Sequence, residues 1–221
     1  MNKKVFDVPY IDEVLSIHEG EKPLSLGERR KRQILEAAFE VLLHKGYDGT
    51  SMQDIAQAAK VKRTLVHHYF KTKDEIIDLL VIYVRTHYQN FVVTKMKEQN
   101  GAPDTLKTYI EAALMWPIEF PKHIRLWLLF FYWCTFKEKY RIKNSEFVRI
   151  GFLRIEALLE EGISAKLFSF SEPAKLVAKQ IQIAITGGVI SLATEQLSKK
   201  EQTQIINKIV LDCLKLVRRK A

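Results

Sequence analysis

The sequence predicts an all-α protein of about nine helices, and three observations support this fold class. Apolar residues recur at three- and four-residue spacing through most of the chain. Several of these segments follow helix start signals, such as a serine with an acidic residue three positions later. No Asn-Gly or Asp-Gly pair lies between two segments of alternating polarity, so β-hairpins are not indicated.

Composition indicates a globular chain with an excess of positive charge. Of 221 residues, 47% are apolar, with only 9 glycines and 6 prolines, so the chain can bury a sizeable core. The formal net charge is +9, which favours anionic partners, chiefly nucleic acid or a membrane surface. A soluble protein that is merely basic remains the alternative.

Localisation and cofactors follow from what the chain lacks. Cys134 and Cys213 have no metal-type spacing and lie among apolar residues, as reduced core thiols do, with a redox-sensing pair as the alternative. The N-terminus has no apolar signal-peptide region. The most apolar run, Leu126 to Phe136, is far shorter than the ~20 residues of a membrane span. We expect a cytoplasmic protein without metal, cofactor or membrane partner.

The N-terminal part reads as an arm followed by a capped helix. Residues 1–24 contain apolar side chains typical of a short docking segment, closed by Gly20 and Pro23. Ser25 and Glu28 have the spacing of a capping box, in which each side chain satisfies a backbone N–H of the other residue. Apolar residues then follow at helical spacing until Gly46 supplies a left-handed stop.

Two short helices and a long one are predicted next. A start signal at Thr50-Ser51 has Gln53 and Asp54 as possible capping partners, and another helix opens near Lys62. A fourth helix starts around Lys73, with acidic residues at its positive end, and runs for about five turns.

The rest of the chain stays helical to its end. We expect breaks at Trp116-Pro117, Phe120-Pro121, Asn144-Ser145, Gly162 and Ser171-Glu172-Pro173. A long helix over residues 173–196 and a last one over 199–219 complete the prediction.

The segment SMQDIAQAAKVKRTLVHHYFK, residues 51–71, has the pattern of a helix-turn-helix. Ile55, Ala56, Val66 and Tyr69 would lie on the inner faces of the two helices, and small alanines allow a steep crossing. The outer face of the second helix is then basic and rich in donors, as suits the major groove. An ordinary pair of core helices with a solvated basic face is the alternative.

The segment from Glu28 to about Val84, about a quarter of the chain, resembles the DNA-binding domain of TetR-family transcriptional repressors. The shared pattern is Thr-x-x-x-Ile-Ala, a turn, Val, a short helix ending in Tyr-Phe, and a Lys-Asp helix start. The resemblance implies an N-terminal arm (1–24), a three-helix helix-turn-helix DNA-binding domain (25–72) and a helical effector-binding and dimerisation domain (73–221).

The resemblance also implies which residues meet DNA. Thr50, Ser51 and Lys73 fall where the family contacts phosphates. Base edges would be read from the start of the recognition helix, where Arg63 suits guanine and Leu65 a thymine methyl. The implied DNA-binding residues are Thr50, Ser51, Lys62, Arg63, Thr64, Leu65, His67, His68, Tyr69 and Lys73.

The chain departs from the family pattern at two positions. Lys60 stands where the family usually has a turn glycine, and a side chain in a left-handed turn costs about 1 kcal/mol. His67 stands where the family usually has a phosphate-contacting tyrosine.

The region around the helix-turn-helix is basic. Residues 22–73 hold eleven Lys/Arg against five Asp/Glu, a balance of +6. The cluster Arg29-Arg30-Lys31-Arg32 suits phosphate contacts or a solvated helix face.

The remaining helices would bind a ligand and a second copy of the chain. By the resemblance, a small hydrophobic or aromatic effector lies among Trp116, Phe120, His123, Trp127, Phe130, Phe131 and Trp133, although such residues are also typical of plain core. Aromatic walls suit a flat ligand that is lipophilic or cationic. The homodimer interface would include Ala184, Gly187, Gly188, Ser191, Ile206, Val210 and Cys213, with packing inside one chain as the alternative. A dimer would read a palindromic operator.

Two other function classes compete with a ligand-released, dimeric repressor. An enzyme is disfavoured because no phosphate-binding loop, His-Glu-x-x-His motif or serine elbow occurs. A basic helical adaptor or membrane-surface protein stays open, and sequence-specific DNA binding would distinguish it from the repressor.

Overall fold

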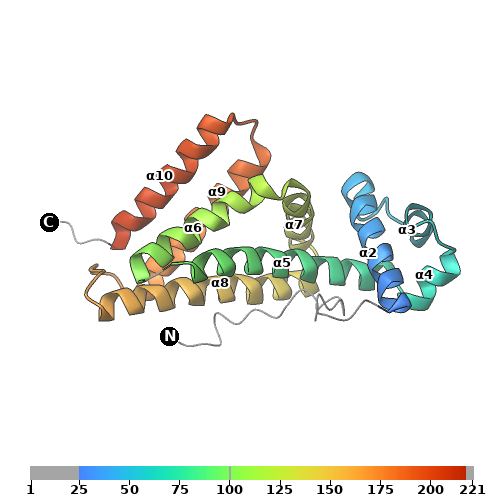
Figure 1. The fold of residues 1–221 in the computed structure, drawn as a ribbon, viewed down its shortest axis with the longest axis horizontal. Coiled ribbons are helices and arrows are strands. Elements are labelled where there is room, and N and C mark those ends of the chain that lie inside the picture. The colour runs from blue at the N-terminus through green and yellow to red at the C-terminus, as the bar shows by residue number, and fades with distance from the viewer. Residues whose placement is uncertain (1–24, 100, 218–221) are drawn as a thin grey trace. The chain divides into compact units, whose positions relative to one another are not determined.

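The computed structural model describes residues 25–99 and 101–217 and confirms the all-α prediction. Over these residues it has nine helices and no strand (Figure 1). They are α2 (Leu26–Lys45), α3 (Met52–Ala58), α4 (Arg63–Tyr69), α5 (Lys73–Lys97), α6 (Ala102–Glu119), α7 (Pro121–Cys134), α8 (Glu138–Ser164), α9 (Ala174–Thr194) and α10 (Lys199–Val217). The predicted arm, 1–24, lies outside the described residues.

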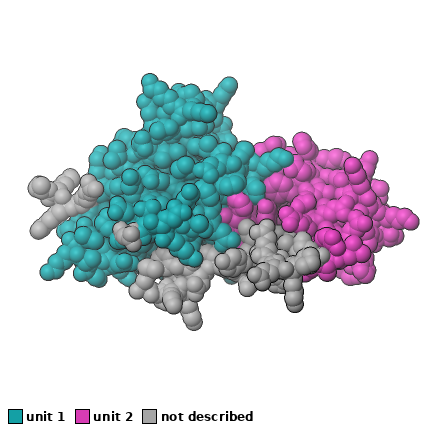
Figure 2. All heavy atoms as spheres, in the orientation of Figure 1, with its two compact units in different colours: residues 1–8, 88–124, 137–221 teal, residues 9–87, 125–136 magenta. Residues whose placement is uncertain are grey.

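The chain divides into two compact units (Figure 2). The described part of one unit comprises residues 25–87 and Arg125–Phe136, and we call it the head unit. The other, the bundle unit, comprises residues 88–99, 101–124 and 137–217. Helices α5 and α7 contribute residues to both. The domain boundary predicted between residues 72 and 73 stays a prediction.

Helix α2 begins and ends as the sequence predicts. The N–H of Glu28 donates to Ser25 Oγ at 3.2 Å, and the N–H of Ser25 donates to Glu28 Oε2 at 2.7 Å. Gly46 ends the helix with φ of 67°, in the left-handed region, and its N–H donates to the Leu42 carbonyl. The buried face of α2 includes Ile34, which packs α2 into the head unit.

The bundle unit is built from α6, α8, α9 and α10, which pack on one another around a continuous apolar core. Gly188 of α9 marks a close approach of helices. A Cβ atom there would lie 2.5 Å from Ile209 Cδ1 and 2.6 Å from Leu114 Cδ2, so α10 and α6 pack against bare backbone.

Three predicted helix breaks are wrong. Helix α6 continues through Pro117 because the proline lies in the final turn, where its missing N–H costs one hydrogen bond, and because its ring is buried in the core. Helix α8 continues through Asn144 and Ser145, whose hydroxyl donates to the Arg141 carbonyl at 2.9 Å instead of competing with the helix. Gly162 also stays helical, and a Cβ there would overlap the Phe168 ring at 1.9 Å, so the glycine makes room for this ring.

Helix α9 is the one described helix that is long and apolar enough to cross a membrane, judged by length and hydropathy alone. A third of its most apolar window is buried within the protein (33%). Length and hydropathy of a single helix are therefore weak support for a membrane span.

Candidate DNA-binding surface

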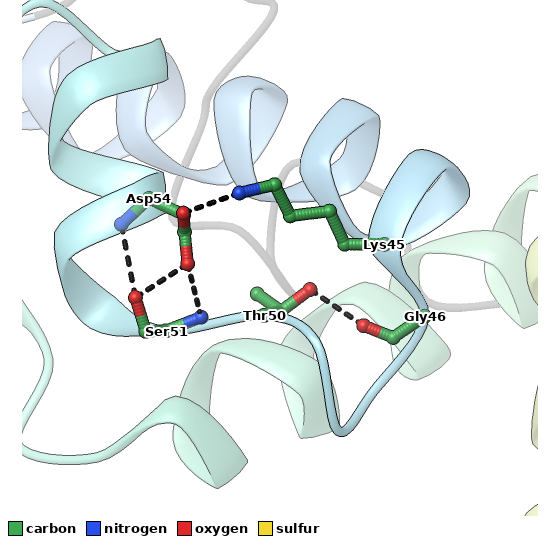
Figure 3. Close-up of polar contacts among 5 residues, drawn as sticks. All are labelled: Lys45, Gly46, Thr50, Ser51 and Asp54. Carbon is green, nitrogen blue, oxygen red and sulfur yellow. Dashed lines mark hydrogen bonds and ion pairs between the residues drawn. The ribbon is translucent and has the colours of Figure 1, made fainter.

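Helix α3 is anchored by a polar cluster at its first turn (Figure 3). Ser51 Oγ accepts from the Asp54 N–H at 3.2 Å, and Asp54 Oδ2 accepts from the Ser51 N–H at 2.8 Å, which completes the predicted capping box. Lys45, at the end of α2, donates to Asp54 Oδ1 at 2.5 Å. The hydrogen bonds from Lys45 and Ser51 hold the pKa of the Asp54 carboxyl well below its usual range. The cluster ties α3 to α2 through one carboxylate.

Thr50, predicted to contact phosphate, is buried. Only 2% of it is exposed, and its hydroxyl donates to the Gly46 carbonyl at 2.6 Å (Figure 3). The hydroxyl hydrogen that a phosphate would need is therefore used within the loop. Ser51 is exposed at the start of α3.

We expect Asp54→Asn to destabilise the protein near neutral pH and to do so less in acid. A lowered pKa in the folded state means that ionised Asp54 stabilises folding above the ordinary carboxyl pKa of about 4. This stabilisation is lost as the pH falls below that value towards the lowered pKa. Urea unfolding at pH 6 and pH 3 checks it, with Asp48→Asn, an exposed aspartate in the loop before α3, as the control. A wild-type-to-variant difference that does not change with pH would contradict the assignment.

The turn between α3 and α4 is left-handed at Lys60, whose φ is 54°. A side chain in this conformation costs about 1–2 kcal/mol, so the lysine is held there by its surroundings. Gln33 Nε2 donates to the Ala59 carbonyl at 2.7 Å, and the Val61 N–H donates to the Ala56 carbonyl at 3.0 Å. The chain thus keeps the turn that glycine would make and adds a side chain to it.

Apolar side chains beneath the turn fix the crossing of α3 and α4. As predicted, Ile55, Ala56 and Val66 are buried. Tyr69, also predicted on the inner face, is only partly buried, and its neighbour Phe70 is the fully buried aromatic residue at the end of α4. Burying Phe70 leaves the opposite face of α4 to solvent.

The exposed face of α4 carries most of the predicted reading residues. Lys62, Arg63, Thr64 and His68 are exposed, and Leu65, His67 and Tyr69 are partly exposed. Arg63 Nε donates to His67 Nε2 at 3.3 Å, one helical turn further on. This contact orients the guanidinium along the outer face of the helix.

An open groove of about 440 Å³ lies beside this face. It is lined by Arg30, Lys60, Val61, Lys62, Thr64, Leu65 and His68. Arg30 and Lys60 were not among the predicted DNA-binding residues. The basic cluster at the start of α2 pointed to Arg30, and the departure from glycine pointed to Lys60, but only the packing of α2 against the turn region brings the two together.

Lys73, predicted as a phosphate clamp, is held by Tyr47. Its ammonium donates to the Tyr47 carbonyl at 2.7 Å and lies 4.2 Å from the centre of the Tyr47 ring. The Tyr47 hydroxyl donates to Asp74 Oδ1 at 2.5 Å. These contacts join the loop after α2 to the start of α5, and the two remaining N–H groups of Lys73 are the donors it has for a phosphate.

The predicted effector residues fall in both units. Trp116, Phe120 and His123 belong to the bundle unit, where the Trp116 ring centre lies 6.3 Å from each of the other two rings and 5.3 Å from Tyr88. Trp127, Phe130, Phe131 and Trp133 belong to the head unit. The cavity beside Trp127 and Phe130 measures about 10 Å³, room for about one water molecule.

The residues predicted for the dimer interface differ in how deeply they are buried. Gly188, Val210 and Cys213 are buried in the core of the single chain, and Ala184 and Ile206 pack against that core. Ser191 is partly buried. Gly187 is exposed, with no atom within 4 Å of its Cβ position. Burial raises the pKa of the Cys213 thiol to about 11, which leaves little reactive thiolate.

The helix-turn-helix region matches a known family. Residues 34–80 match the family model of bacterial regulatory proteins of the tetR family. Over 50 residues the chain is 40% identical to the HTH-type transcriptional regulator PksA of Bacillus subtilis, a match covering 23% of this chain and 24% of that protein. Over 80 residues it is 26% identical to IcaR of Staphylococcus aureus, a negative transcriptional regulator of a biofilm operon, covering 36% of this chain and 43% of IcaR. The matches therefore span less than half the length of either relative.

The fold extends the likeness along the chain. A transcriptional regulator from Saccharomonospora viridis, solved in complex with choline, superposes with a TM-score of 0.70 over 87% of this chain and 99% of its own, at 21% identity. At that identity the likeness speaks for the fold. The helix-turn-helix match over residues 34–80, to the tetR family of bacterial regulatory proteins, and the shared fold agree with the prediction of a DNA-binding transcriptional regulator rather than an enzyme.

Proposed function

We propose that the protein is a dimeric repressor that binds a palindromic operator and is released by a small-molecule effector. The observation that carries the DNA-binding part is the exposed basic face of α4, with Lys62, Arg63 and His68 beside an open groove. A helix that exposes hydrogen-bond donors on one face and packs its other face against the core suits insertion into the major groove. The relative IcaR is a negative transcriptional regulator. We place the protein in the cytoplasm, where its operator is.

An apolar stripe on α9 supports the homodimer. Leu176, Ile183 and Ile190 are exposed large apolar residues spaced seven apart, and thus on one helix face. Gly187 lies between the last two and leaves room for a helix from another chain to approach its backbone. Two copies joined through this face would present two heads to the two halves of a palindrome.

The effector site is proposed around Trp116 in the bundle unit. Tyr88, Phe120 and His123 surround this ring, and Tyr88 belongs to α5, the helix that contributes residues to both units. A ligand that prefers one position of α5 would change the spacing of the heads and so lower operator affinity.

The charge in this core favours an acidic effector. Arg154 is 2% exposed and interacts electrostatically with Tyr88 and Tyr109. Burial lowers the pKa of its guanidinium, since a buried cation is poorly solvated. A carboxylate placed near this guanidinium would gain a charge-assisted contact.

We therefore expect aromatic carboxylates to release the operator at concentrations about tenfold lower than their primary amides, about 1.4 kcal/mol of discrimination. Arg154→Met should remove this preference, while Arg149→Met, an exposed arginine on the same helix, should keep it. Fluorescence anisotropy of a labelled operator gives the release curves, and thermal unfolding confirms that both variants fold. Equal release by acids and amides from the wild-type protein would contradict the acidic effector.

Selection of random duplexes by the purified protein tests the function itself. At near-physiological salt we expect enrichment of one palindrome, as a dimeric sequence-specific reader requires. Salt-sensitive binding without any enriched sequence would instead favour the basic adaptor or membrane-surface protein.

A further inference from the structure

Lys60 has a left-handed backbone conformation, which is unfavourable for a residue that carries a side chain. Its φ of 54° is one of two positive φ values at non-glycine residues in the described ranges, the other being 59° at Lys166. Three hydrogen bonds fix the turn. Gln33 donates to the Ala59 carbonyl, and the N–H groups of Lys60 and Val61 donate to carbonyls of α3. The backbone therefore cannot relieve the strain without breaking these contacts, and strain of this kind gathers at functional positions.

The Lys60 side chain is exposed on the wall of the basic groove. Arg30 comes to this groove from α2, Lys62 from the residue that caps α4, and His68 from the last turn of α4. Three of the lining side chains are cationic, and no carboxylate belongs to the described lining. The groove is open to solvent, so an anion of extended shape can reach it.

We propose that Lys60 is a phosphate-binding residue that adds affinity for the operator backbone without reading sequence. This deepens the DNA-binding function proposed above and rests on it. A duplex lying along α4 would bring a phosphodiester to the groove, where Lys60 and Arg30 flank it. A lysine ammonium acts on a phosphate as a point charge, so its effect is the same for every base sequence. The positive φ of Lys60 costs folding free energy, and in return the turn carries a cation that glycine would not supply.

Lys60→Gly tests the proposal, because glycine accepts the turn and removes only the side chain. We expect operator affinity at 0.15 M salt to fall about three- to tenfold, and the slope of log K against log salt to fall in magnitude by about 0.9, the value for one phosphate contact. A scrambled duplex of equal length should lose affinity by the same factor. The midpoint of thermal unfolding should rise or stay unchanged.

Three further variants separate charge from backbone effects. Lys60→Asn, which tolerates the left-handed turn without charge, should match Lys60→Gly, and Lys60→Arg should bind as the wild type does. Lys166→Gly relieves the other positive φ and removes the same charge from an exposed site of the bundle unit, so its DNA affinity and salt slope should equal those of the wild type.

Two results would overturn the proposal. One is an unchanged salt slope in Lys60→Gly, with or without a loss of affinity, because a lost phosphate contact must change the slope. The other is a loss restricted to the operator, which would make Lys60 a base-reading residue. Failure of the proposed function looks different, since the wild-type protein would then show no preference for any duplex over the scrambled one.

Discussion

Arg63→Ala is expected to lower operator affinity by about 1–3 kcal/mol, roughly five- to 160-fold, and to relax the preference at one base pair of each half-site. Arg63 is exposed at the first residue of α4, and its Nε is occupied by His67 at 3.3 Å. The terminal nitrogens of the guanidinium can then pair with the O6 and N7 atoms of a guanine. Competition binding with all single-base variants of the selected operator measures the effect.

The matched control is Arg149→Ala, which removes an exposed arginine from α8 and changes the net charge equally. We expect that variant to retain the operator preference. If Arg63→Ala weakens operator and scrambled duplexes by the same factor, Arg63 contacts phosphate, and base reading must come from other residues of α4.

Phe70→Ala is expected to reduce the free energy of unfolding by about 3–5 kcal/mol. Phe70 is fully buried at the end of α4, under the helix-turn-helix, and its loss would leave a cavity that the short helices cannot fill. Because native stabilities are about 5–15 kcal/mol, the variant should lose most of its operator binding on mild warming. Urea unfolding followed by circular dichroism measures the change.

Phe136→Ala makes the same chemical change at an exposed position of the head unit, where 57% of the residue is accessible. We expect a change below about 1 kcal/mol there. Comparable effects of the two substitutions would mean that Phe70 is not part of the core that supports α4.

Local signals along the chain were sufficient to predict most of the helices and the exposed face of α4. Capping boxes, a stop glycine and an acidic first turn act within four residues, so the starts of α2, α3 and α5 could be predicted from neighbouring side chains. The same holds for α4, because subtracting the apolar positions of a short helix leaves its polar face. Helix breaks were predicted less well, since the cost of Pro117 or Gly162 depends on what packs around each residue.

The roles of individual polar and small residues depended on contacts between segments distant in sequence. Nothing local shows that Tyr47 holds Lys73, that Gln33 secures the turn at Lys60, or that Arg30 reaches the same groove as Lys60. Gly187 and Gly188 are adjacent glycines, yet Gly187 has open space beside it and Gly188 is packed against α6 and α10. Adjacent helix residues point about 100° apart, so which of them meets a neighbouring helix is set by how the helices pack. The sequence therefore predicts the helices and the outer face of α4, whereas packing decides which cations line the groove and which glycines face solvent.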